Sequence, residues 1–259
     1  MEEEPYTISA SKISCFKKCR RDFELTYIEG LEPAQKHSTL AIGSKYHEDL
    51  EQYLLGKITS SDNYLVQAFI NHIDISSWED ITTEEYKNSG LSHDIRLNSI
   101  TDAKTSVNKR RYIVEHKTTS QKIDEQLEYD LQWDDQIPIY CGLEETYDVL
   151  YTVIKKCTLR LKKNQTEAEF FKERVNWYKT DTESKIRCFK FPVSKERVTK
   201  HREETLELAR HMRDTKLFYR NKTACNMFGG CKHKSYCLTH QKGELPLGCV
   251  RNKYYKGEE

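Results

Sequence analysis

The segment from Arg111 to Thr119 places a carboxylate and an ammonium group two residues apart, at Glu115 and Lys117. A short apolar run of strand formers, residues 112–114, precedes them. Because side chains at i and i+2 of a strand share a face, both groups would face one ligand. Such a pair suits metal-assisted phosphodiester hydrolysis: the carboxylate holds a hard divalent cation, and the lysine steadies the attacking water or the developing negative charge. A solvated pair on an edge strand is the alternative.

A second chemical signal lies near the C-terminus, where Cys225, Cys231 and Cys237 are each separated by five residues. Tetrahedral zinc sites usually contain paired Cys-x-x-Cys motifs, which this stretch lacks, whereas an iron–sulfur cluster accommodates wider loops. The spacing leaves a cluster, zinc and plain structural thiols open. The candidates for a fourth ligand are Cys15, Cys19 and Cys249.

The composition indicates a folded protein in a reducing compartment. The chain has 259 residues, 37% of them hydrophobic, which is enough for a substantial core. No apolar run approaches the roughly 20 residues that span a bilayer, and the first five residues, Met-Glu-Glu-Glu-Pro, do not resemble a signal peptide. The nine cysteines, an odd number, argue against a disulfide framework and for metal ligation by some of them. We expect no membrane association and a cytoplasmic location, in a host cytoplasm if the gene is viral.

The net charge of +1 gives no argument for a polyanionic partner, but basic residues gather in two places. Either group could contact phosphates or form a solvated face. The first group consists of Lys104, Lys109, Arg110 and Arg111, and the second of Lys155, Lys156, Arg160, Lys162 and Lys163.

Hydrophobic periodicity predicts helices first, then a small sheet, then a mixed order of elements. The pattern favours one α/β domain without repeats or linkers. The expected helices cover residues 9–27, 39–56, 62–74, a stretch after 124, 167–178 and 195–215. The expected strands cover residues 81–87, 92–101, 112–118, 147–154 and 186–193, with turns at Gly90 and at residues 104–108.

Three further polar positions stand out on these elements. His47 lies beside the apolar stripe of the second helix, where a structural role is the usual alternative to metal binding. Asn98 points to the opposite face of its strand from Leu97. Gln136 and Tyr140, four residues apart, share a helical face and could contact a phosphate or the lysine, or lie at the edge of the core.

Taken in order, these motifs resemble the PD-(D/E)XK nuclease superfamily. Within it the chain is most similar to RecB-type and Cas4-like exonucleases with an iron–sulfur cluster, with the cysteine pattern of AddB, and to phage members. The motifs are Cys19 in Phe-Lys-Lys-Cys-Arg-Arg-Asp-Phe, His47 in Gly-Ser-Lys-Tyr-His-Glu, residues 96–102 Arg-Leu-Asn-Ser-Ile-Thr-Asp, residues 113–118 Ile-Val-Glu-His-Lys-Thr, residues 136–140 Gln-Ile-Pro-Ile-Tyr, and the three late cysteines.

The resemblance implies a restriction-endonuclease-like core, a central mixed β-sheet flanked by helices, with N-terminal helices and a C-terminal cysteine-rich segment. It implies a single nuclease domain over residues 1–259, with a catalytic core at 80–155 and a cluster region formed by 1–30 and 220–240. His47, Glu115 and the carbonyl of His116 would bind Mg or Mn. Lys117 would be the catalytic lysine, which Gln136 and Tyr140 would position unless they contact DNA. Cys19, Cys225, Cys231 and Cys237 would hold a [4Fe-4S] cluster.

One position departs from the family pattern: Asn98 stands where we expect the metal-binding aspartate. An amide oxygen carries no formal charge, so metal affinity and water alignment should suffer. We favour an introduced Asp-to-Asn change that traps an inactive form. A natural loss of catalysis is the second explanation. The third, which we rank last, is that Asp102 supplies the carboxylate, because about 13 Å separates positions 98 and 102 on an extended strand.

The sequence therefore predicts a metal-dependent DNA exonuclease that acts on single-stranded or duplex ends in recombination, repair or phage DNA processing. A recombinase, a helicase or a single-strand-binding protein is a possible partner class. The contrasting hypothesis is a non-catalytic module that binds DNA ends or a protein partner and retains the fold.

Overall fold

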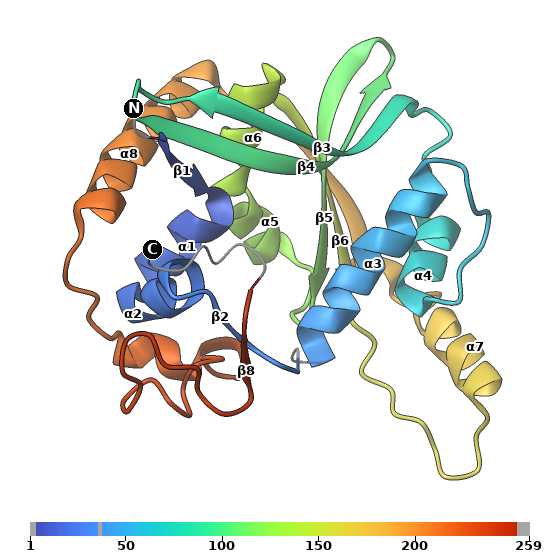
Figure 1. Cartoon of the computed structure of the whole chain (residues 1–259). Helices are drawn as coiled ribbons and strands as arrows, with labels where there is room; N and C mark the ends of the chain where they lie inside the picture. Colours follow the sequence, from blue (N-terminus) through green and yellow to red (C-terminus); the bar gives the residue numbers. More distant parts are fainter. Residues whose placement is uncertain (1–3, 36–37, 253–259) are drawn as a thin grey trace. The chain divides into compact units, whose positions relative to one another are not determined.

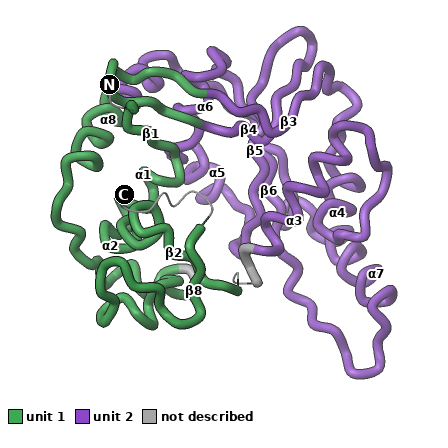
Figure 2. Tube along the Cα trace, in the orientation of Figure 1, with its two compact units in different colours: residues 1–38, 88–98, 203–259 green, residues 39–87, 99–202 purple. Residues whose placement is uncertain are grey.

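The computed structural model describes residues 4–35 and 38–252 (Figure 1). The chain divides into two compact units, each built from separate stretches (Figure 2). Unit 1 comprises residues 1–38, 88–98 and 203–259, and unit 2 comprises residues 39–87 and 99–202. The prediction of a single domain stays a prediction.

Unit 1 contains both ends of the chain. Strand β1 (Tyr6–Ser9) runs parallel to the first residues of β4 (Ile95–Val107), with Ser9 opposite Asn98. Ser9 also caps helix α1 (Ala10–Lys18) by accepting the N–H of Lys12. Helix α2 (Arg20–Phe23), a π-helical turn (Glu24–Ile28) and β2 (Leu31–Pro33) follow, and β2 pairs with β8 (Cys249–Arg251). A 3₁₀ helix, Lys222–Gly229, carries Cys225.

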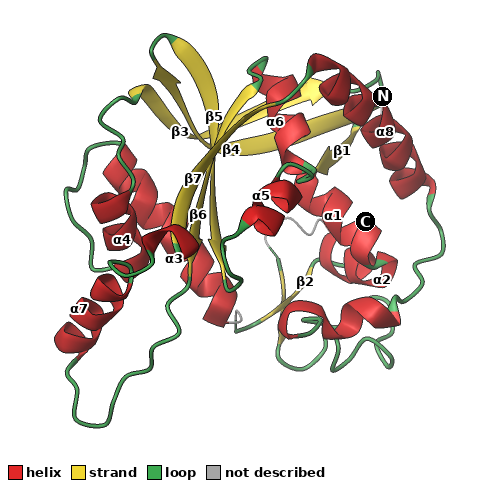
Figure 3. Ribbon diagram, turned by 180° about the vertical axis from the view of Figure 1, so that it is seen from behind, coloured by secondary structure: helices red, strands yellow, loops and turns green. Residues whose placement is uncertain are grey.

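Unit 2 contains most of a mixed sheet, in the order β1-β4-β5-β6-β7 with β3 also paired to β4 (Figure 3). Strand β5 is antiparallel to β4 and parallel to β6, and β7 is antiparallel to β6. The remaining strands are β3 (Glu79–Gly90), β5 (Arg110–Thr119), β6 (Asp148–Lys155) and β7 (Ile186–Pro192). The helices are α3 (Ser38–Leu54), α4 (Tyr64–His72), α5 (Glu125–Leu131), α6 (Gln136–Glu144), α7 (Glu167–Trp177) and α8 (Lys195–Asp214), of which α8 continues into unit 1.

The core of unit 2 fixes the position of β5. Tyr46 and Leu50 of α3 repeat every four residues and pack with Phe69 of α4 against Val114 of β5. Residues 112–116 of β5 are all buried, so both faces of the strand are covered. A strand buried in this way holds the polar groups at its end in place, because its side chains have no freedom to shift.

The predicted mixed sheet flanked by helices is confirmed, but the turn expected at residues 104–108 is wrong. Strand β4 continues to Val107, because buried and less buried side chains keep alternating past Ala103. Asn108 and Lys109 make the turn, with φ values of 50° and 64°. A two-residue hairpin turn with left-handed residues matches the twist of the strands on both sides. Within residues 4–35 and 38–252, no helix has the length and apolarity needed to cross a bilayer.

Candidate active site

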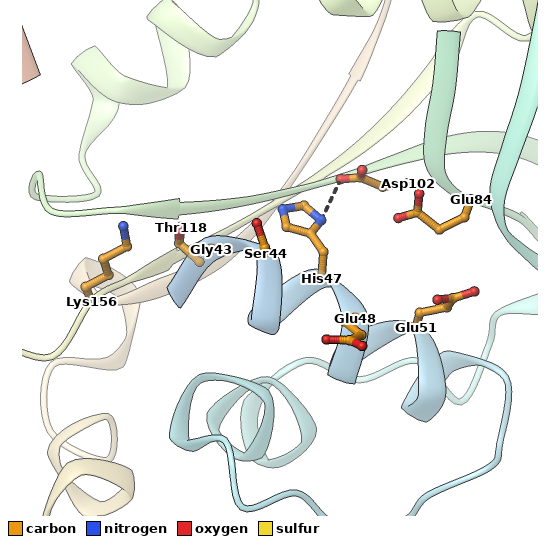
Figure 4. Close-up of a pocket in the computed structure, with 9 residues that line it drawn as sticks. All are labelled: Gly43, Ser44, His47, Glu48, Glu51, Glu84, Asp102, Thr118 and Lys156. Atoms are coloured by element: carbon orange, nitrogen blue, oxygen red, sulfur yellow. Dashed lines mark ion pairs between the residues drawn. The ribbon is translucent and has the colours of Figure 1, made fainter. Parts of the chain in front are cut away.

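Three elements of unit 2 bring a histidine and two carboxylates together. His47 comes from α3, Glu84 from β3 and Asp102 from β4, and one ligand atom of each lies within 4.8 Å of the others. Nδ1 of His47 is 3.4 Å from Oδ2 of Asp102 (Figure 4). An imidazole nitrogen with carboxylate oxygens at this spacing is a donor set for a divalent cation.

Asp102 is tied to the end of β5. Its Oδ2 accepts the backbone N–H of His116, the residue after Glu115, at 2.9 Å. Burial raises the pKa of Asp102, although His47 and the His116 N–H oppose the shift. Asp102 thus joins the histidine of α3 to the strand that carries Glu115 and Lys117.

Glu115 is buried, and its Oε2 atom has no hydrogen-bond partner among the described residues. Burial raises the pKa of Glu115 well above its usual range, and the negative charges of Asp102 and Asp134 add to the shift. A buried carboxylate oxygen without a partner is costly unless a cation or a proton satisfies it. The ligand atoms of His47, Glu84 and Asp102 therefore fit a divalent cation, and the Glu115 oxygen without a partner is a further candidate ligand.

Lys117 leaves β5 on the same face as Glu115, as predicted, and its side chain is 46% exposed. Nζ of Lys117 lies 3.6 Å from Oδ2 of Asp134, which also accepts the hydroxyl of Tyr151 at 3.0 Å. Asp134, which the sequence analysis did not single out, is thus the residue that the structure places beside the lysine. Its position in a turn between two short helices gave no periodic signal.

Gln136 and Tyr140 lie side by side on α6, where Nε2 of Gln136 donates to the Tyr140 hydroxyl at 2.7 Å. Burial, followed by the charge of Glu115, raises the pKa of Tyr140. The pair therefore lies near the carboxyl group of Glu115. Its contact with DNA or with Lys117 stays a prediction.

Glu84 is the metal-site residue that sequence reasoning missed. It lies within β3 with φ at 48°, a left-handed conformation that residues other than glycine rarely adopt in a strand. Burial raises the pKa of Glu84, and the charges of Asp102 and Glu51 contribute. Strained backbone of this kind often marks functional positions. The sequence around Glu84 contains no signal, such as a glycine, that would have predicted this backbone conformation.

The site opens into a pocket of about 750 Å³. Its two ends differ in chemistry (Figure 4). Around His47, the acidic end carries Asp102, Glu84, Glu51 and Glu48, whereas Thr118 and Lys156 lie at the other end. A cation would fit the acidic end, and an anionic group the opposite end.

The structure brings Asp102, and not Asn98, to His47. Asn98 lies four residues earlier on β4, opposite Ser9 of β1, and does not line the pocket. Four residues of extended strand span about 13 Å, so only one of these two positions can reach α3. The geometry thus favours the explanation that the sequence analysis ranked last, in which Asp102 supplies the carboxylate. The ring of His116 packs against Phe69, and the role of its carbonyl stays a prediction.

The four candidate cluster cysteines all lie in unit 1. Sγ of Cys19 accepts the N–H of Asn221 at 3.3 Å, and Sγ of Cys225 lies 3.6 Å from the carbonyl oxygen of the same residue. Cys231 donates its N–H to the carbonyl of Cys225. Among the described residues, however, the cysteine sulfurs do not form a group of the size that holds a single metal ion. These contacts bring Cys19 close to Cys225 without defining a ligand set.

Residues 7–80 match the model of the PD-(D/E)XK nuclease superfamily. This match covers Cys19 and His47 and ends before Glu84, Asp102, Glu115 and Lys117. The chain is thus similar to this superfamily over the part that holds His47, and the histidine–carboxylate group of unit 2 could hold a metal ion. No curated protein matches the chain in sequence.

Solved structures with a similar arrangement share little sequence with this chain. The crystal structure of SSO0001 has a TM-score of 0.51 and 15% identity, covering 92% of this chain and 88% of that chain. At this identity the likeness shows the fold alone. A phage related exonuclease from Haemophilus somnus 129PT has a TM-score of 0.38 and 13% identity, covering 80% and 93% of the two chains, which is too distant to support an inference.

Proposed function

We propose that this protein is a Mg- or Mn-dependent DNA exonuclease that hydrolyses phosphodiester bonds at strand ends. The observation that carries the proposal is the convergence of His47, Glu84 and Asp102, with Asp102 hydrogen-bonded to β5 at His116, between Glu115 and Lys117. His47 would offer Nδ1, Asp102 and Glu84 would offer carboxylate oxygens, and Glu115 would add a further carboxylate from β5.

When bound, the cation would supply Lewis-acid stabilisation of the charge that develops on the phosphate oxygens. The protein's own residues do the positioning. The His116 N–H fixes Oδ2 of Asp102, and burial holds Glu115 in one rotamer. Lys117 would donate to the attacking water or the phosphate, and Asp134, at 3.6 Å, restrains its flexible side chain.

The experiment compares linear and covalently closed circular DNA of the same sequence, with Mg²⁺, with Mn²⁺ and with a chelator. We expect the linear DNA to be shortened from its ends with either metal, and no loss of the circle. Cleavage of the circular DNA, which has no ends, would indicate an endonuclease instead of an exonuclease. Lack of cleavage of either form with both metals would leave the non-catalytic DNA-binding module as the better account.

We further propose that Cys19, Cys225, Cys231 and Cys237 bind a [4Fe-4S] cluster, as in the RecB-type and Cas4-like exonucleases that the motif order resembles. The support is the contact of both Cys19 and Cys225 with Asn221. A cluster core is larger than a single ion, so its ligands need not lie as close as those of zinc. Protein purified without oxygen should be brown and contain about four irons per chain. One zinc and no iron would contradict the cluster.

For the biological setting we propose DNA recombination, repair or phage DNA processing in the cytoplasm. The support is the resemblance of residues 151–160 and 167–174 to phage members of the superfamily, together with nine cysteines that suit a reducing compartment. Loss of viral DNA recombination after disruption of the gene would test this setting.

A further inference from the structure

The connection between β6 and α7 concentrates positive charge. Residues 149–166 contain five lysines and arginines and no acidic residue, although the whole chain has a net charge of only +1. The five are Lys155, Lys156, Arg160, Lys162 and Lys163, and we call residues 155–163 the basic arm. Charges of one sign concentrated in this way create a local positive field.

The basic arm is held at both ends and exposed between them. At its start, the Tyr178 hydroxyl donates to the carbonyl of Lys155 at 2.6 Å. At its far end, Thr166 begins α7 with a reciprocal capping box formed with Glu169. Figures 1 and 3 show the connection as a long loop that projects from the sheet. The side chains of residues 160–164 are all exposed, although Lys162 also pairs with Glu173 of α7 at 2.8 Å. A partner in solution can reach these charges.

The basic arm starts in the wall of the catalytic pocket. Lys156 lines this pocket together with Thr118, at the end away from the acidic residues (Figure 4). Its backbone N–H donates to the carbonyl of Thr119 at 2.7 Å, which extends the pairing of β6 with β5 by one residue. A polyanion in the pocket would therefore meet Lys156 first and then the exposed cations of the arm.

We propose that the basic arm binds the phosphates of the DNA strand that leads out of the catalytic pocket. The proposal rests on the proposed function, because DNA is the polyanion that a metal site of this kind would act on. Two observations carry the proposal: the arm is positive whereas DNA is negative, and the arm is continuous with the wall of the pocket. The arm neutralises DNA phosphates that lie outside the pocket, away from the phosphate that reacts.

The test measures how salt weakens DNA binding. Fluorescence anisotropy of a labelled oligonucleotide, single-stranded or duplex, is recorded with a chelator so that no hydrolysis occurs. The test variant is R160Q/K162Q/K163Q. The control, K57Q/K122Q/K179Q, removes three exposed lysines of unit 2 outside both basic groups and lowers the net charge equally. The arm forms neither helix nor strand, and equal melting temperatures would show that both variants fold.

Loss of three phosphate contacts should reduce the slope of log K against log salt by about 2 for single strands and nearly 3 for duplex. The control should keep the wild-type slope. An unchanged slope in the arm variant overturns the proposal, even if the wild type degrades DNA. The arm variant could show a reduced slope while the wild type binds DNA but never cleaves it. This result would support DNA binding by the arm and contradict the proposed nuclease activity. Weaker binding of polyglutamate with unchanged DNA binding would assign the arm to an acidic protein instead.

Discussion

Oδ2 of Asp102 lies 3.4 Å from Nδ1 of His47 while it accepts the N–H of His116 at 2.9 Å. One carboxylate oxygen therefore connects an early helix to the strand that carries Glu115 and Lys117. A backbone donor cannot be lost by side-chain rotation, so the position of Asp102 is fixed before any cation binds.

Asp102→Asn should reduce metal-dependent cleavage of linear DNA by about 100-fold or more, because the cation loses an anionic ligand of the proposed set. Asn98→Asp should leave the rate unchanged, because position 98 does not line the pocket. Initial rates with end-labelled DNA measure both effects. A large gain of activity in Asn98→Asp, with little loss in Asp102→Asn, would return the metal site to position 98.

Glu84→Gln should raise the Mn²⁺ concentration needed for half-maximal rate several-fold, because a charged ligand of the cation is removed. Glu48→Gln is the matched control: Glu48 lines the same pocket and does not belong to the group of three ligand atoms. Metal titrations at fixed DNA concentration separate the two variants. Equal shifts in both would mean that Glu84 contributes only to the general field of the pocket.

Lys117→Ala should lower the turnover rate by about 100-fold to 10,000-fold, the range expected when a positioned proton donor or acceptor is removed. DNA affinity measured with a chelator should change little. Lys122→Ala, an exposed lysine five residues later, should retain activity. Asp134→Asn should give a smaller loss than Lys117→Ala, because it loosens the lysine without removing it. The reverse order would make Asp134 the more important group.

Cys19→Ser should lower the melting temperature and the iron content together, because a cluster between residues about two hundred apart closes a very long loop. Cys188→Ser is the control, since Cys188 is exposed and lies in unit 2 on β7. Thermal unfolding and iron analysis under anaerobic conditions provide the measurements. Full iron content in Cys19→Ser would remove this residue from the ligand set.

The carboxylate of Asp94 should stabilise unit 1 at neutral pH. A hydrogen bond from Ser92 and the contact with Arg213 lower the pKa of Asp94 to about 2. Because the folded pKa lies below the ordinary value of about 3.8, this stabilisation is present above pH 3.8 and is lost as the pH falls toward 2. Asp94→Asn should therefore melt earlier than the wild type at pH 7, and the two curves should converge in acid.

The sequence predicted the parts of the site that depend on local periodicity. The shared face of Glu115 and Lys117 follows from strand geometry, and the regular pairing of β5 with β6 through these residues agrees with it. The stacking of Gln136 on Tyr140 follows from helix geometry, and their hydrogen bond agrees with it. The choice between Asn98 and Asp102 depended on which position of β4 meets α3. The contact between β4 and α3 is a tertiary contact. Residues 98 and 102 lie on the same face of the strand, so side-chain alternation cannot distinguish them. The position of Glu84 depends on the left-handed backbone at this residue, and the position of Asp134 depends on a turn, so neither could be predicted from periodicity.

The way the units are assembled from the chain sets an order on folding during synthesis. Unit 2 is complete once residue 202 has left the ribosome, whereas unit 1 still lacks its last stretch, residues 203–259. Unit 2, which contains the pocket and the basic arm, can thus become compact before the cysteines at 225, 231 and 237 have been synthesised. A nascent chain stalled beyond residue 202 would then contain every residue that lines the pocket before the cysteine-rich end exists.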